Sequence, residues 1–332
     1  AFVTGPADLM SMLTGMNKIY WLYIIFVYYI LATLLPIDKI IGAIYPYFGA
    51  TLLFMAVAVA GSMIVKSLDG SLQMTELTLN TFRNFHSNPE TNILFPMMFV
   101  VISCGAISGF HATQSPMMAR CMTDEKYGRP CFYGAMISEG IVALIWATAA
   151  ISYFGGPDGL NAAAAAGKTP AIMVNEICNT WLGKFGAAIA IVGVVICPIT
   201  SGDTAFRSLR LIIADALKFK QGPIRNRLIV AVPVFVIAYI LTQVDFSTIW
   251  KFVGIGNQML AAIILWTASS YLVSVKKPHW IMSIPATFIT YICASYFVAA
   301  PHSVGGLALG INTAYIAGGI VALGVVVLFD LM

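Results

Sequence analysis

The segment IGAIYPYFGATLLFMAVAVAGSMIV, residues 41–65, carries no charged side chain over its whole length. About 20 apolar residues are enough to cross the hydrocarbon core of a bilayer as a helix. The same character extends over the chain of 332 residues, of which 59% are hydrophobic and 10% are charged, with a mean hydropathy of +0.87. Because an ordinary soluble domain has about 25% charged residues, a soluble globular protein is excluded, and so is a disordered chain.

Further apolar runs follow along the chain, each continuous rather than alternating, as is typical of membrane-spanning helices. We therefore predict an all-α polytopic membrane protein with about nine transmembrane helices in a single transmembrane domain, residues 1–332. The run that ends at residue 201 is short, and Pro198 with Gly202 favours a helix break there. The runs lie at residues 19–36, 41–65, 93–113, 131–154, 185–201, 228–243, 252–275, 280–300 and 309–331.

The basic residues predict how these helices are oriented, because cytoplasmic loops carry the excess of Lys and Arg. Alternate loops divide the 18 basic residues into sets of 12 and 6. The larger set, which we place in the cytoplasm, is Lys39, Arg120, Lys126, Arg129, Arg207, Arg210, Lys218, Lys220, Arg225, Arg227, Lys276 and Lys277. The C-terminus is then cytoplasmic and residue 1 is outside, so we expect further helices to precede a chain that starts at Ala1 without Met.

Polar groups at membrane depth are costly, and a ligand pathway is the usual reason to keep them. The segment GAISGFHATQSP, residues 105–116, combines two glycines, a proline and several hydroxyls. We predict that the helix opens here and exposes backbone groups to a substrate. The candidate binding residues are Ser108, Gly109, His111, Thr113 and Ser115. The alternative is a kinked packing helix in which His111 bonds a neighbouring carbonyl.

Glu139 is an acid well inside an apolar span, within the segment YGAMISEGIVAL at residues 133–144. Desolvation should raise the pKa of this carboxyl toward the range in which it can take up and release a proton. Glu139 is therefore a candidate proton carrier. In the alternative interpretation, it is a permanently protonated or hydrogen-bonded acid that locks two helices together.

The segment TSGDTAFR, residues 200–207, follows the expected helix break. Several oxygen ligands at such a break suit a hard cation such as sodium, and the candidates are Thr200, Ser201 and Thr204. Asp203 is a further candidate for ion coupling, and with Arg207 four residues on it can form a helical ion pair. The alternative is a helix cap that starts a cytoplasmic helix at residues 203–219.

Two adjacent amides, Asn257 and Gln258, lie in the apolar segment GIGNQMLAA at residues 254–262. Buried amides need partners, so these two either contact substrate or bond other helices as packing contacts. The six cysteines form no CxxC pair and no Cys/His cluster at metal-ligand spacing, so we expect no cofactor beyond a coupling proton or sodium.

These four segments, SGFHA at residues 108–112, GAMISEG at 134–140, TSGDTAFR at 200–207 and GNQMLAA at 256–262, resemble in order the signature segments of the carbon starvation protein A (CstA) family. The resemblance covers about residues 90 to 275. It implies a bacterial inner-membrane importer of pyruvate or peptides driven by a proton gradient. It also implies kinship with the amino acid/polyamine/cation (APC) transporters and a LeuT-like fold of two inverted five-helix repeats.

On that fold, residues 19–65 would end the first repeat, 93–275 would form the second, and 280–331 would be two accessory helices. The first helices, which should include the other broken helix, would be missing from this chain. The resemblance thus predicts a secondary active transporter in which the substrate carboxylate meets His111 and freed amides near residue 109. Glu139 or the segment around Thr200 would take the coupling ion.

Two other classes of function remain as alternatives. A Ser/His hydrolase would use Ser108 or Ser115 with His111, but the G-x-S-x-G spacing and its strand-turn-helix context are lacking. The other alternative is a channel or a structural membrane subunit. We predict a transporter rather than an enzyme, with a small carboxylate or a peptide as its substrate and the lipid bilayer as its surroundings. We expect no nucleic acid partner.

Overall fold

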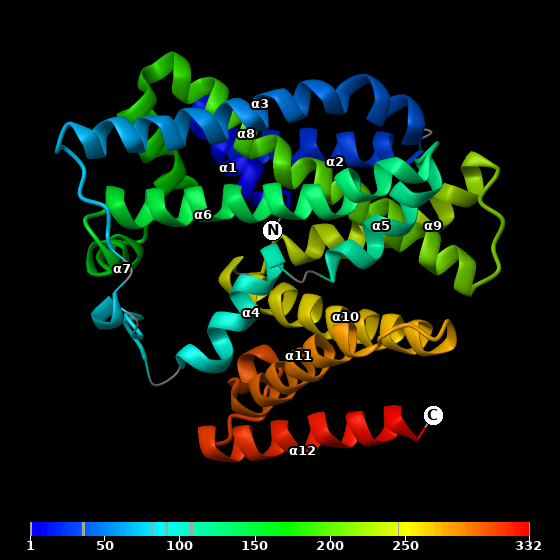
Figure 1. Cartoon of the computed structure of the whole chain (residues 1–332). Helices are drawn as coiled ribbons and strands as arrows, with labels where there is room; N and C mark the ends of the chain where they lie inside the picture. The colour runs from blue at the N-terminus through cyan, green and yellow to red at the C-terminus, as the bar shows by residue number, and fades with distance from the viewer. Residues whose placement is uncertain are drawn as a thin grey trace. The chain divides into compact units, whose positions relative to one another are not determined.

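A computed structural model describes residues 2–34, 37–76, 78–81, 83–89, 92–106, 109–244 and 246–331 of the chain (Figure 1). Within helices, the side chains of residues 34, 37–44, 80, 103–106, 110, 112, 113, 246–248 and 304 lie outside this description. The described residues form helices and turns and contain no strand. The prediction of an all-α chain is confirmed for this part of the molecule.

Seven helices among the described residues are long and apolar enough to cross a membrane. They coincide with seven of the predicted runs, so the chain is a multi-pass membrane protein. The run at 19–36 forms a shorter apolar helix, α2 (Lys18–Leu34). The run at 93–113 falls on two helices, α4 (Leu94–Ala106) and α5 (Phe110–Cys121). The predicted count of nine spanning helices is therefore not confirmed.

The chain folds into two compact units, each formed from two separate parts of the sequence. Unit 1 comprises residues 1–85 and 137–244, and unit 2 comprises residues 86–136 and 245–332. Each unit has its own buried core. The predicted assignment of residues 19–65 and 93–275 to two inverted repeats stays a prediction.

Unit 1 is organised around its longest helix, α8, which packs against α1, α2, α3 and α9 (Figure 1). One core cluster gathers Leu9, Met55, Cys178 and Ile191, and another gathers Phe26 and Tyr29 with Phe235. Besides α2, the elements are α1 (Thr4–Thr14), α3 (Ile37–Leu68), the 3-10 turn η1 (Leu79–Thr81), α6 (Ala135–Tyr153), α7 (Pro157–Ala165), α8 (Pro170–Ala216) and α9 (Ile224–Leu241).

The backbone of α8 departs from helical geometry at Gly183, where φ is 65°. Glycine adopts this left-handed region without steric cost, so the position can separate residues 170–182 from the rest of the helix. The predicted break at Pro198 and Gly202 is wrong, because α8 continues through both residues. A Cβ at Gly202 would lie 2.3 Å from the Tyr29 hydroxyl oxygen. This glycine therefore allows α2 to approach α8 closely and does not interrupt the helix.

Unit 2 is built on α10 and α11, with α4 packed against both and α12 packed against α11 (Figure 1). A Cβ at Gly318 of α12 would lie 2.1 Å from Oγ of Ser295, so glycine permits the close contact of α11 with α12. Besides α4 and α5, the elements are the 3-10 turn η2 (Glu125–Tyr127), the π-helical turn η3 (Arg129–Gly134), α10 (Phe246–Ser274), α11 (Trp280–Ala299), the 3-10 turn η4 (His302–Val304) and α12 (Ile311–Asp330).

Candidate functional site

A buried ion pair lies in the core of unit 1. Nη2 of Arg207 is 3.2 Å from Oδ1 of Asp203 one turn earlier on α8, and the two side chains are 5% and 2% exposed. Removing a charge from water costs several kcal/mol, so such groups persist in a core only when they are paired and hydrogen-bonded. The helical ion pair predicted from the sequence is confirmed.

Two other helices of unit 1 hold this pair in place. Nη2 of Arg207 also donates to the backbone oxygen of Ala32 on α2, at 2.5 Å. The hydroxyl of Tyr45 on α3 donates to Oδ2 of Asp203, at 3.2 Å. Both oxygens of the carboxylate are thus engaged, and α2, α3 and α8 converge on one charged centre.

Two hydroxyls of α2 beside this centre are buried and have no hydrogen-bond partner among the described residues: Oη of Tyr28 and Oγ1 of Thr33. Thr33 is 1% exposed and follows Ala32, the residue that accepts from Arg207. Tyr28 is close enough to Asp203 and Arg207 to interact electrostatically with both. A buried polar group without a partner costs about 1–3 kcal/mol, so these hydroxyls are candidate ligand contacts. We call Tyr28, Thr33, Tyr45, Asp203 and Arg207 the ion-pair cluster.

The hydroxyls predicted to hold sodium are arranged differently from a cation site at a broken helix. Oγ1 of Thr200 donates to the Cys197 carbonyl and Oγ1 of Thr204 donates to the Thr200 carbonyl, each at 2.9 Å within α8. Ser201 is half-buried on the same continuous helix. The helix break that motivated this site is absent, although Asp203 lies in the ion-pair cluster. Sodium binding here stays a prediction.

Glu139 lies on α6 and is exposed, outside the core of unit 1. It is close enough to Cys197 of α8 for its charge to act on that thiol. The core of unit 1 does not enclose this carboxyl, and its desolvation inside an apolar membrane span stays a prediction. Its assignment as a proton carrier stays a prediction.

In unit 2, two of the predicted segments come into contact. Gly109, in the turn before α5, packs directly on α10, where a Cβ would lie 2.3 Å from the Asn257 carbonyl oxygen and 2.7 Å from Cβ of Leu260. No other residue fits this position without displacing backbone. The sequence predicts functional residues in 105–116 and in 254–262 separately. The tertiary structure brings the two segments into contact at Gly109 and Asn257.

Beside this contact, Gln258 of α10 is fully buried. Its Nε2 makes a long hydrogen bond of 3.5 Å to the Phe99 carbonyl of α4, while its Oε1 has no partner among the described residues. Because a carbonyl oxygen only accepts, the amide nitrogen must face Phe99, and an acceptor remains buried. Asn257 is 8% exposed. We call Phe99, Gly109, Asn257 and Gln258 the amide cluster.

The other predicted substrate residues lie near this cluster in sequence. His111 and Ser115 are half-buried on α5 and, four residues apart, lie on one side of that helix. Thr113 belongs to α5, but its side chain lies outside the described part, and Ser108 lies wholly outside the described residues. The separate helices α4 and α5 flank that position.

Sequence reasoning did not identify Tyr28, Thr33 and Tyr45 as candidate residues. Tyrosine and threonine in an apolar run resemble ordinary membrane-helix residues, and nothing in their spacing singles them out. Only the packing of α2 and α3 on α8 brings them to Asp203 and Arg207.

Among the described residues, no group of three or more His, Cys, Asp or Glu side chains could hold a metal ion.

Comparison with known proteins gives one family. The family model described as "Carbon starvation protein CstA" matches residues 3–183 and 159–295. An uncharacterised membrane protein of Haemophilus influenzae is 46% identical over 157 residues, which are 44% of this chain and 42% of that protein. No solved structure matches the chain.

Two relatives of Escherichia coli K12 have functional names. The peptide transporter CstA is 27% identical over 270 residues, which cover 60% of this chain and 38% of that protein. The pyruvate/proton symporter BtsT is 43% identical over 58 residues, or 17% of this chain and 8% of that protein. This chain therefore spans less than half the length of these relatives. Their names agree with the expectation of a transporter rather than an enzyme.

Proposed function

Because the chain belongs to the carbon starvation protein CstA family, we propose that it is part of a secondary active transporter that imports a small carboxylate, such as pyruvate, or peptides. The match to the family model over most of the chain carries this proposal. The named relatives, a peptide transporter and a pyruvate/proton symporter, support the two substrate classes. The proposal places the protein in the bacterial inner membrane, as the family resemblance implies. Its C-terminus lies in the cytoplasm, as the distribution of basic residues predicts.

The amide cluster supports the substrate side of the proposal. The unpartnered Oε1 of Gln258 is an acceptor, so it suits a donor such as a peptide N–H or an ammonium group. His111 on α5 supplies a group that can bind a carboxylate. A peptide has both a hydrogen-bond donor and a carboxylate, so its donor would bind Oε1 of Gln258 and its carboxylate would bind His111. The Gly109 contact keeps backbone close to this place without a side chain between.

The ion-pair cluster supports the coupling side. Asp203 is a buried carboxylate bonded to Tyr45 of α3 and to Arg207 of α8, and Arg207 also donates to the Ala32 carbonyl of α2. A change in the charge of Asp203 would therefore alter contacts of all three helices. Such a shared contact can link ion binding to helix movement, as alternating access requires. The unpartnered hydroxyls of Tyr28 and Thr33 offer oxygen ligands for a proton-bearing group or a sodium ion.

The test is uptake by the full-length protein in liposomes. Labelled pyruvate and a labelled dipeptide are offered in turn, with a proton gradient and a sodium gradient imposed separately. We expect saturable uptake of one substrate that depends on one gradient. Uptake without saturation would indicate a channel. The absence of uptake of both substrates under both gradients would contradict the proposal.

A further inference from the structure

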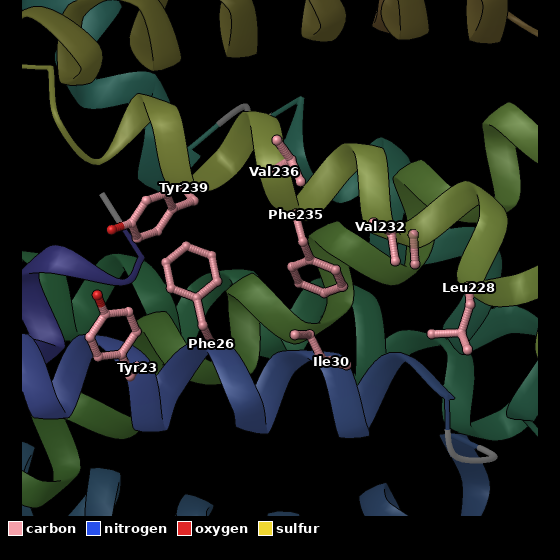
Figure 2. Close-up of a pocket in the computed structure, with 9 residues that line it drawn as sticks. Tyr23, Phe26, Ile30, Leu228, Val232, Phe235, Val236 and Tyr239 are labelled. Atoms are coloured by element: carbon pink, nitrogen blue, oxygen red, sulfur yellow. The ribbon is translucent and has the colours of Figure 1, made fainter.

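An apolar groove of about 320 Å³ runs between α2 and α9 on unit 1 (Figure 2). The side chains of Phe26 and Ile30 face it from α2, and those of Val232 and Phe235 face it from α9 (Figure 2). Leu228 lies at one end and Tyr239 at the other. Leu228 and Tyr239 are 11 residues apart, or about 16 Å along a helix. That length is close to half of a hydrocarbon core of about 30 Å, so the groove matches an acyl chain of one leaflet.

Leu228, at one end of the groove, directly follows Arg227, which belongs to a cluster of nitrogen donors. Nη1 of Arg210 on α8 donates to Oε1 of Gln221, at 2.6 Å. Nε of Arg227, the residue before Leu228, donates to the Gln221 carbonyl, at 2.8 Å. Gln221 thus links Arg210 to the start of the groove, and the charges of Arg210 and Arg227 are close enough to repel each other.

Two donors at this place are left without partners. Nε of Arg210 and Nε2 of Gln221 are buried, and neither has a hydrogen-bond partner among the described residues. Arg210 is 5% exposed in the structure. Both free atoms are N–H groups, so the missing partner is an acceptor, and two positive charges nearby favour one that carries negative charge.

We propose that this face of unit 1 binds an anionic phospholipid, with one acyl chain in the groove between α2 and α9 and the headgroup phosphate at Arg210, Gln221 and Arg227. The guanidinium groups and the amide supply donors to the phosphate oxygens, and the apolar walls cover the chain. The charged end is the cytoplasmic end in the topology predicted from the basic residues, where the leaflet is rich in anionic lipid. This inference does not rest on the proposed function.

The test measures lipid binding to the full-length protein in detergent by native mass spectrometry. The probes are phosphatidylglycerol and phosphatidylethanolamine with the same acyl chains, in about 0.3 M ammonium acetate, where attraction by exposed charges is screened. We expect phosphatidylglycerol to bind about tenfold more tightly, because charge-assisted hydrogen bonds to a buried site survive the salt. Equal binding of the two lipids would overturn the proposal.

Two pairs of variants locate the site. Arg210→Gln should weaken phosphatidylglycerol binding about tenfold. Arg225→Gln removes an exposed charge at the same end of α9, and it should change binding by less than about twofold at this salt concentration. Val232→Trp fills the groove, whereas Ile237→Trp adds the same bulk to α9 at an exposed position that does not line the groove.

Val232 and Ile237 are 52% and 59% exposed, so neither substitution disturbs the core and both variants should fold. We expect Val232→Trp to weaken binding of both lipids and Ile237→Trp to leave it unchanged. Equal losses from Arg210→Gln and Arg225→Gln would show only general attraction by surface charge and would reject the headgroup site. Wild-type binding by Val232→Trp would reject the acyl groove, independently of whether Arg210→Gln folds.

Discussion

In unit 1 the buried polar centre is charged and is held by three helices, whereas in unit 2 it is neutral and is held by α4 and α10 beside the Gly109 turn. The ion-pair cluster engages both oxygens of Asp203. The amide cluster leaves Oε1 of Gln258 without a partner among the described residues. The cost of leaving a charge unpaired far exceeds that of leaving an amide oxygen unpaired. Around Asp203 each carboxylate oxygen has a partner, and the open groups of that cluster include the neutral hydroxyls of Tyr28 and Thr33. In unit 2 the open group is itself a neutral amide oxygen, which can accept from a ligand.

The largest loss of stability should come from removing one partner of the Asp203–Arg207 ion pair. Arg207→Met leaves Asp203 as a buried carboxylate without its cation, and we expect a loss of about 3–5 kcal/mol of stability. Thermal unfolding of the full-length protein in detergent measures this. The double variant with Asp203→Asn should recover part of the loss, because no unpaired charge remains.

A control for this prediction is Asp215→Asn, which changes an exposed acid farther along α8. Its stability should stay within about 0.5 kcal/mol of the wild type. If Arg207→Met were as stable as Asp215→Asn, the description of Asp203 as a buried carboxylate that depends on its cation would be wrong.

The second effect concerns the close contact in unit 2. Gly109→Ala places a Cβ 2.3 Å from the Asn257 carbonyl oxygen, and we expect a loss of about 2 kcal/mol from overpacking. Gly256→Ala is the matched control, since no atom lies within 4 Å of a Cβ there. In the interior of α10, alanine should be neutral or slightly stabilising. Equal melting temperatures for the two variants would contradict the packing of Gly109 on α10.

The third effect separates binding from packing at Gln258. Gln258→Met keeps the volume and removes the unpartnered acceptor, so stability should change by less than about 1 kcal/mol. Uptake in liposomes should fall about tenfold if the amide contacts substrate, because a hydrogen bond to substrate is worth about 1.4 kcal/mol. Wild-type uptake by this variant would show that Gln258 only packs between helices. The unpartnered amide oxygen of unit 2 would then have no role in substrate binding.

The smallest effect tests the contribution of α3 to the ion-pair cluster. Tyr45→Phe removes the hydroxyl that donates to Asp203, and we expect a loss of about 1 kcal/mol. Tyr47→Phe on the same helix is the control, because Tyr47 is 74% exposed and its hydroxyl should contribute little. Chemical denaturation in mixed micelles measures both. A larger loss from Tyr47→Phe would place the important hydroxyl elsewhere on α3.

The sequence predicted the helical class and the position of most spans, because a continuous apolar run has few alternatives in a bilayer. It also predicted the Asp203–Arg207 pair, since residues four apart on a helix must lie side by side. The predicted helix break at Pro198 and Gly202 was wrong because it depends on contacts between helices rather than on neighbours along one helix. Glycine occurs both at helix breaks and at close contacts between helices, and proline also occurs inside membrane helices. At Gly202 the outcome depends on Tyr29 of α2, which lies far away in sequence.

The amino-acid sequence therefore predicts local features: which segments are apolar enough to be helices in a membrane, and which polar residues interrupt them. Which of these polar positions come into contact depends on how the helices pack. This packing brought Gly109 to Asn257, and it brought Tyr45 and the Ala32 carbonyl to Asp203 and Arg207. The physical reason is that helix periodicity constrains only neighbours within a turn or two, whereas contacts between helices depend on how whole surfaces pack.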